Sequence, residues 1–135
     1  AAEMGALVFG TLHTNGAANT IDRLIDAFPA NEQPQVRTTL AESIAGVVSQ
    51  LLLRTADGPG RCAVTEILLK TAGLPNVIRE GNTPMITSII QGGKAAGMQL
   101  MDDALMTLVE EKRITPREAY MKATNKQKFE AMIED

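Results

Sequence analysis

The sequence predicts an α/β fold in which residues 1–70 form the end of a sheet with flanking helices and residues 71–135 form a small helical bundle. The first indication is the unbroken apolar run Leu7-Val8-Phe9, which is typical of a strand buried on both faces. The second is that helical patterns with sharp stops follow residue 71. Because 44% of the 135 residues are hydrophobic, we expect a single domain.

The composition argues against several classes of partner. The formal net charge of −3 is spread over both signs without a basic block, so we expect no nucleic-acid partner. The single cysteine, Cys62, cannot form an internal disulfide, and no apolar run reaches the roughly 18 residues that a membrane span needs. We therefore expect a cytoplasmic protein that does not insert into a membrane. Because the chain starts without Met, we also expect it to be a piece of a longer protein.

Polar residues follow the first apolar run. Residues 1–4 resemble the last turn of a helix that Gly5 ends, and the strand over residues 7–9 comes next. Thr11, His13 and Thr14 then place hydroxyl groups and the only imidazole at the carboxyl end of this strand, where ligands bind in open α/β sheets. Two interpretations of His13 stay open: contact with a phosphate, or a structural histidine bonded to the backbone.

Two helices and a hairpin are predicted next. The first helix ends at Pro29, and its apolar face consists of Ile21, Leu24, Ile25 and Phe28. A long second helix begins near residues 31–34, and its apolar face consists of Val36, Leu40, Ile44, Val47 and Leu51. Residues 51–54 then leave the helix and pair with residues 62–69 across the turn sequence of residues 57–60, Asp-Gly-Pro-Gly.

The remaining sequence is helical and well punctuated. We expect Thr71 to cap a helix that Gly81 ends, and a helix beginning at Thr83-Pro84 to end at Gly92-Gly93. A further helix has the apolar face Met98, Met101, Leu105 and Leu108. Residues 115–118 form a capping box that opens another helix. The pair Asp102-Asp103 is expected on a solvated face rather than in a metal site.

Four segments, read in order, resemble the secretion ATPase family, and within it the type IV pilus retraction ATPases. Residues 1–14, AAEMGALVFGTLHT, are similar to the His box of the family, and residues 17–29 to the helix that follows it. Residues 76–80, NVIRE, are similar to the end of the AIRNLIRE motif of retraction ATPases. Residues 97–102, GMQLMD, are similar to their GMQ-x-(L/M)-D segment.

The resemblance implies the C-terminal portion of a RecA-like P-loop ATPase that retracts type IV pili. It further implies a homo-hexamer at the cytoplasmic face of the inner membrane, with an inner-membrane pilus platform protein as partner. Thr11 and His13 would act on the γ-phosphate, and Thr14 would contact the nucleotide. Residues 76, 79 and 80 (Asn76, Arg79 and Glu80) would couple ATP turnover to retraction. ATP and Mg²⁺ would be held in the full-length parent, whose phosphate-binding motifs precede the His box, so we expect the chain alone to hold neither and to be inactive.

Two departures from the family motifs, and two alternatives, accompany this resemblance. Ala6 stands where family members often carry a second histidine, and Pro75 stands where AIRNLIRE has its first arginine. One alternative is an assembly or type II secretion ATPase, which generally has a cysteine-rich zinc module that Cys62 alone cannot form. The other alternative is a free-standing interaction module whose helices bind a partner.

Overall fold

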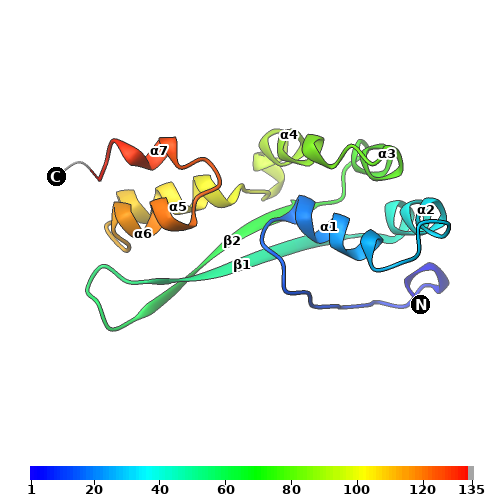
Figure 1. Ribbon diagram of the computed structural model, residues 1–135, viewed down its shortest axis with the longest axis horizontal. Coiled ribbons are helices and arrows are strands. Elements are labelled where there is room, and N and C mark those ends of the chain that lie inside the picture. The colour runs from blue at the N-terminus through cyan, green and yellow to red at the C-terminus, as the bar shows by residue number, and fades with distance from the viewer. Residues whose placement is uncertain (134–135) are drawn as a thin grey trace.

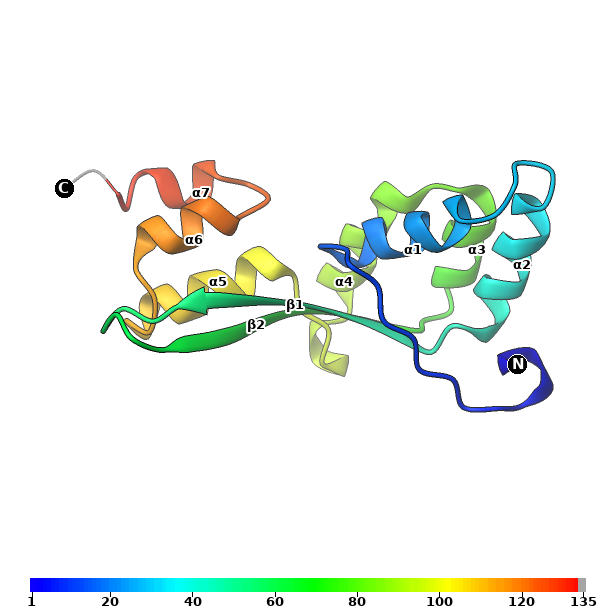
Figure 2. The ribbon, with the colours of Figure 1, turned by 60° about the horizontal axis from the view of Figure 1, so that its bottom comes forward.

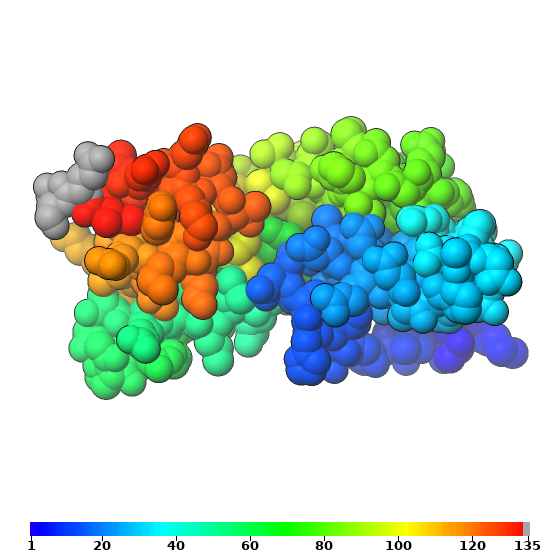
Figure 3. All heavy atoms as spheres, viewed as in Figure 1, coloured from blue at the N-terminus to red at the C-terminus, as the bar shows by residue number. Residues whose placement is uncertain are grey.

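The computed structural model describes residues 1–133, which form two lobes joined by a long β-hairpin (Figures 1 and 2). The first lobe contains η1 (Ala2–Met4), α1 (Ala17–Asp26), α2 (Gln33–Ser43), α3 (Leu74–Glu80), η2 (Thr83–Met85) and α4 (Ile86–Gly92). The hairpin is formed by β1 (Gly46–Arg54) and β2 (Arg61–Leu69), and η3 (Lys94–Ala96) lies between the lobes. The second lobe contains α5 (Met101–Glu110), α6 (Pro116–Lys122) and α7 (Gln127–Glu130). The two lobes lie at opposite ends of the molecule in the space-filling view of Figure 3.

The hairpin confirms the predicted turn but corrects the predicted second helix. β1 and β2 are antiparallel, and their register runs from Gly46 opposite Leu69 to Arg54 opposite Arg61. The helix α2 therefore ends at Ser43, and the predicted continuation through residue 51 is wrong. A spacing of four residues keeps side chains on one face in a helix and in a strand alike, so Val47 and Leu51 fit both patterns. Residues 46–54 form a strand because they pair with β2 along its whole length.

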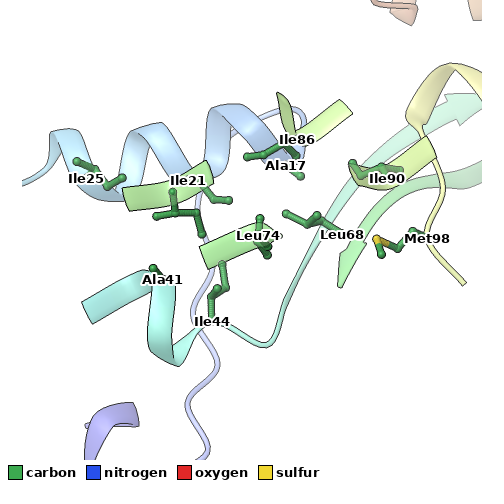
Figure 4. Packing of buried hydrophobic residues seen from close by; sticks show 11 residues of the cluster. Ala17, Ile21, Ile25, Ala41, Ile44, Leu68, Leu74, Ile86, Ile90 and Met98 are labelled. Atoms are coloured by element: carbon green, nitrogen blue, oxygen red, sulfur yellow. The ribbon is translucent and has the colours of Figure 1, made fainter. Parts of the chain in front are cut away.

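The core of the first lobe lies between α1, α2, α3, α4 and the adjacent end of the hairpin (Figure 4). Its buried residues are Ala17, Ile21, Ile25, Ala41, Ile44, Leu68, Leu74, Ile78, Ile86, Ile90 and Met98. Ile21 and Ile25 confirm the predicted apolar face of α1. Phe28 does not belong to this face, because α1 ends at Asp26 and the Phe28 side chain is 45% exposed.

The core of the second lobe lies between α5, α6, α7 and the far end of the hairpin. Its buried residues are Leu53, Cys62, Val64, Met101, Leu105, Leu108, Val109, Ile114, Ala119, Ala123 and Phe129. Half of the predicted capping box of α6 is confirmed, since Thr115 Oγ1 accepts a hydrogen bond from Glu118 N at 3.2 Å. The Glu118 carboxylate accepts from Arg54 N at 3.1 Å and so joins α6 to β1.

The predicted strand over residues 7–9 is wrong for the described residues. Residues 6–12 are extended but lie outside any sheet, and the side chains of Leu7 and Phe9 are 83% and 88% exposed. A strand needs a neighbouring backbone that accepts and donates its hydrogen bonds. The two-stranded sheet of residues 1–133 pairs β1 only with β2 and does not include this segment.

The short helices of the first lobe begin and end mostly as predicted. Gly81 ends α3 with a left-handed φ of 69°, and the segment that begins at Thr83 continues through α4 to Gly92. Thr71 is not the cap of α3. That helix begins at Leu74, and Thr71 contributes only a carbonyl oxygen that lies 3.4 Å from Leu74 N.

Asp102 is buried, contrary to the prediction of a solvated face. Its side chain is 8% exposed, and its two carboxylate oxygens accept hydrogen bonds from Thr124 N at 2.9 Å and Asn125 N at 2.8 Å. Asp103 remains near the surface, where it pairs with Lys94 at 3.2 Å. Asp102 therefore fixes the loop between α6 and α7 to the first turn of α5.

Replacing Asp102 by Ala is expected to lower the free energy of unfolding by about 2–3 kcal/mol, because the backbone N–H groups of Thr124 and Asn125 lose a charged acceptor. Asp103→Ala is the matched control, and we expect it to cost less than about 1 kcal/mol, as for other exposed ion pairs. Urea unfolding of the two variants measures the difference. Equal losses in both variants would contradict the structural role of Asp102.

Candidate functional site

A polar depression of roughly 510 Å³ lies between the loop before α1 and the polar face of α1. Its lining residues are His13, Thr14, Asn15, Asn19, Asp22, Arg23 and Asp26. The residues from α1 recur at positions i, i+3, i+4 and i+7, and they lie opposite the buried Ile21 and Ile25. The amphipathic pattern that buries one face of α1 therefore also presents charged groups to the depression.

The loop that carries His13 and Thr14 is held by hydrogen bonds at its C-terminal end. Thr20 Oγ1 donates to Gly16 O at 2.8 Å, so the Thr14 hydroxyl donates the 2.7 Å hydrogen bond between the two threonine side chains. Gly16 has a left-handed φ of 89°, a conformation that glycine adopts without strain. Its N–H donates to Ser49 Oγ at 2.8 Å.

Glu66 fixes the start of α1 to the hairpin. Its Oε1 atom accepts a hydrogen bond from Ala17 N at 2.8 Å, next to the bond between Gly16 and Ser49. Ser49 and Glu66 are directly opposed on β1 and β2, so both side chains lie on the face of the hairpin that packs against the helices. Ser49 and Glu66 therefore fix the position of the loop where it enters α1.

The three residues predicted for catalysis and nucleotide contact are not all brought together. His13 and Thr14 both line the depression, and the His13 side chain is exposed. Thr11 is exposed in the extended segment and does not line the depression. The donors and charged groups that surround His13 come from α1 and were not among the predicted site residues.

The predicted coupling residues lie on α3, away from the depression. Asn76, Arg79 and Glu80 are exposed, and Arg79 lies 3.6 Å from the carboxylate of Glu42 on α2 and 3.4 Å from Asn76 Oδ1. Pro75 occupies the first turn of α3, where the missing N–H has no helical partner to lose. The structure therefore accommodates this departure from the family motif within an intact helix.

A hydrogen bond joins the depression to the segment that follows α3. Asp22 Oδ2 accepts from Thr83 Oγ1 at 3.0 Å, and the Thr83 side chain is buried. Asp22 lines the depression from α1, whereas Thr83 begins η2 two residues after Gly81. This hydrogen bond therefore connects α1, which lines the depression, to the segment that follows α3.

Sequence reasoning missed two kinds of site residue. The polar face of α1, with Asp22, Arg23 and Asp26, carried a signal because charged residues at helical spacing share a face. Glu66 carries a signal because it is a carboxylate on the same face of β2 as the buried residues Val64 and Leu68. A charged side chain in that position needs hydrogen-bond donors from elsewhere in the fold.

Gln99, from the GMQ segment, has a structural role in this chain. Its Nε2 atom donates to Thr65 O at 2.7 Å and to Thr65 Oγ1 at 2.9 Å, and its backbone pairs with Ile67. Gln99 also lines a second, smaller depression of roughly 250 Å³ between β2 and α5. The segment therefore extends the edge of the hairpin before α5 begins.

Two negative findings concern residues 1–133 only. In this part of the chain no group of three or more His, Cys, Asp or Glu side chains is arranged to bind a metal ion. None of its helices is both long enough and apolar enough to cross a bilayer.

Comparisons with known proteins agree on one family. The chain is 51% identical over 125 residues to the twitching motility protein of Neisseria gonorrhoeae, and the match covers 93% of this chain and 33% of that protein. It is 46% identical over 129 residues to the type IV pilus retraction ATPase PilT of Pseudomonas aeruginosa, with 96% and 37% covered. The crystal structure of the pilus retraction motor PilT with bound ADP matches with a TM-score of 0.79 and 37% identity, over 93% of this chain and 35% of that chain.

These matches confirm the predicted α/β fold class and the resemblance to retraction ATPases. The chain spans about a third of the length of these relatives. The family model described as type II/IV secretion system protein matches residues 1–133. The chain therefore belongs to the type II/IV secretion system protein family.

Proposed function

We propose that the chain is the C-terminal part of a hexameric motor ATPase that uses ATP hydrolysis to retract type IV pili. The observation that carries this proposal is the match to the ADP-bound retraction motor PilT over 93% of the chain. The polar depression supports a binding site beside His13, because it brings His13 and Arg23 together with polar side chains, and the carboxylates of Asp22 and Asp26 line it as well. In this motor the chain supplies one side of the nucleotide site.

His13 is the residue that meets the γ-phosphate, together with Thr11, and Thr14 contacts the nucleotide. Asn15 and Arg23 can donate hydrogen bonds at the same depression, whereas Asp22 accepts from Thr83 Oγ1 and Asp26 adds a second carboxylate. When bound, ATP supplies the phosphoryl group, and Mg²⁺ neutralises charge on its oxygens. Mg²⁺ would be held mainly by residues outside this chain.

Asn76, Arg79 and Glu80 couple ATP turnover to retraction. Their exposure on α3 suits contacts with neighbouring subunits of the ring or with an inner-membrane platform protein. The hydrogen bond between Asp22 and Thr83 supports this coupling, since it links the polar face of α1 to the segment after α3. We place the motor at the cytoplasmic face of the inner membrane, where it would contact such a platform.

Replacing His13 by Ala in the full-length motor should lower ATP turnover about 100-fold or more, because a group that contacts the transferred phosphate is lost. The affinity for ADP should change much less, since the contact strengthens in the transition state. Phosphate-release kinetics and ADP titration measure the two effects. Ser88→Ala, an exposed change on α4, serves as the control. A variant that loses ADP binding but keeps kcat would contradict this role.

Replacing Arg79 or Glu80 by Ala should stop twitching motility while ATP turnover by the purified motor persists. The ion pair between Arg79 and Glu42 is exposed, so its loss should cost less than about 1 kcal/mol of stability. Arg117→Ala changes an exposed arginine of α6 and is the matched control. Normal twitching in both α3 variants, with His13→Ala still lacking ATPase activity, would refute the coupling role.

The 135-residue chain on its own should release no phosphate from ATP. Phosphoryl transfer depends on positioning and charge stabilisation, which need a phosphate cradle and a held Mg²⁺. A phosphate-release assay with ATP and Mg²⁺ tests this expectation. Turnover that disappears in the His13→Ala variant of the isolated chain would show that the chain carries a complete site.

A further inference from the structure

Glu66 contacts the first residues of two helices that belong to different lobes. Its Oε1 atom accepts a hydrogen bond from Ala17 N at 2.8 Å, and its Oε2 atom accepts one from Met101 N at 3.0 Å. Ala17 is the first residue of α1, and Met101 is the first residue of α5. One carboxylate therefore fixes the position of both helices relative to β2.

A carboxylate suits this place because a helix begins with unpaired N–H groups and a partial positive charge. Neither helix has a side-chain cap of its own, since Gly16 precedes α1 and Leu100 precedes α5. Hydrogen bonds from N–H groups to an ionised acceptor are also stronger than those to a neutral one. Glu66 thus supplies from the sheet what both helices lack locally.

Hydrogen bonds and covalent backbone links together connect the loop of His13 to the C-terminal helices through Glu66. The loop over residues 11–16 leads directly into Ala17, whose N–H binds Glu66. The other oxygen of Glu66 holds Met101, and the next residue, Asp102, binds the backbone of Thr124 and Asn125. These contacts therefore lead from the loop over residues 11–16 to α5 and to the loop between α6 and α7.

We propose that Glu66 is a positioning residue that transmits movement of the loop over residues 11–16 to α5 and the C-terminal helices. This inference rests on the proposed function, in which that loop meets the nucleotide. Ser49 offers a matched comparison. Its hydroxyl anchors the same loop through Gly16 N, but among the hydrogen bonds of the described residues it has none to α5.

The test measures amide hydrogen exchange of the full-length motor with and without ADP and with a non-hydrolysable ATP analogue. In the unaltered protein, nucleotide should slow exchange in residues 11–20 and also in residues 99–106. In the Glu66→Gln variant the response should persist at residues 11–20 and be lost at residues 99–106. A glutamine keeps one acceptor oxygen but turns an NH₂ group toward the second helix N–H.

ATP turnover by Glu66→Gln should fall about tenfold with a change in ADP affinity below about threefold, as expected for a residue that modulates coupling. Ser49→Ala should keep the exchange response of both segments. Glu66→Asp keeps the charge on a shorter side chain that cannot reach both helices, and it should behave as Glu66→Gln does. It provides a second variant in case the glutamine variant does not fold.

Three exchange results would contradict the proposed role of Glu66. If nucleotide still slows exchange at residues 99–106 in the Glu66 variants, Glu66 is only a structural cap and the proposal is wrong. If the unaltered protein responds at residues 11–20 but not at residues 99–106, the proposal is also wrong although the proposed function stands. If neither segment responds to either nucleotide in the unaltered protein, the proposed function and this inference both fail.

Discussion

The two hydrogen bonds of Glu66, which lies opposite Ser49 on the hairpin, are the interaction that joins the two lobes. The face of the hairpin that packs against the helices is apolar toward both ends, where Leu68 and Leu53 belong to the two cores. Between them lie a hydroxyl and a carboxylate, which bind the backbone at the starts of α1 and α5. A partly buried carboxylate is stable there only because N–H groups satisfy both of its oxygens. The hairpin therefore separates the two cores and aligns the helices that cover them.

The sequence predicts those parts of the fold in which one local pattern has one structural solution. The face with Ile21 and Ile25 needs only helical spacing, and the N-cap formed by Thr115 needs only the turn that follows it. A local pattern gives a wrong prediction when it fits both a helix and a strand, or when contacts with distant residues determine the outcome. Val47 and Leu51 suit helix and strand equally, and the buried position of Asp102 is set by backbone groups that lie more than 20 residues later.

The candidate site also has parts that the local sequence indicates and parts that it does not. His13 and Thr14, which the sequence places in one loop, both line the depression, whereas Thr11 of the same loop does not, so their roles at a nucleotide stay a prediction. The anchor of that loop is not predictable, because Glu66 is separated from Ala17 by 49 positions and meets it only after the hairpin forms. Sequence spacing contains no information about a contact that folding creates between a strand and a distant helix. A lone carboxylate on a buried strand face is the clearest local sign of such a contact.

The polar middle of the hairpin also determines how the two lobes can influence each other. Apolar packing is non-directional, so two lobes joined by a continuous core tolerate small shifts without a preferred response. Hydrogen bonds weaken steeply with angle and distance, so helices held by one carboxylate must move together or lose a bond. Ala17 and Met101 are held in this way. The hydrogen bonds of Glu66 therefore provide the proposed link between the loop before α1 and the orientation of α5.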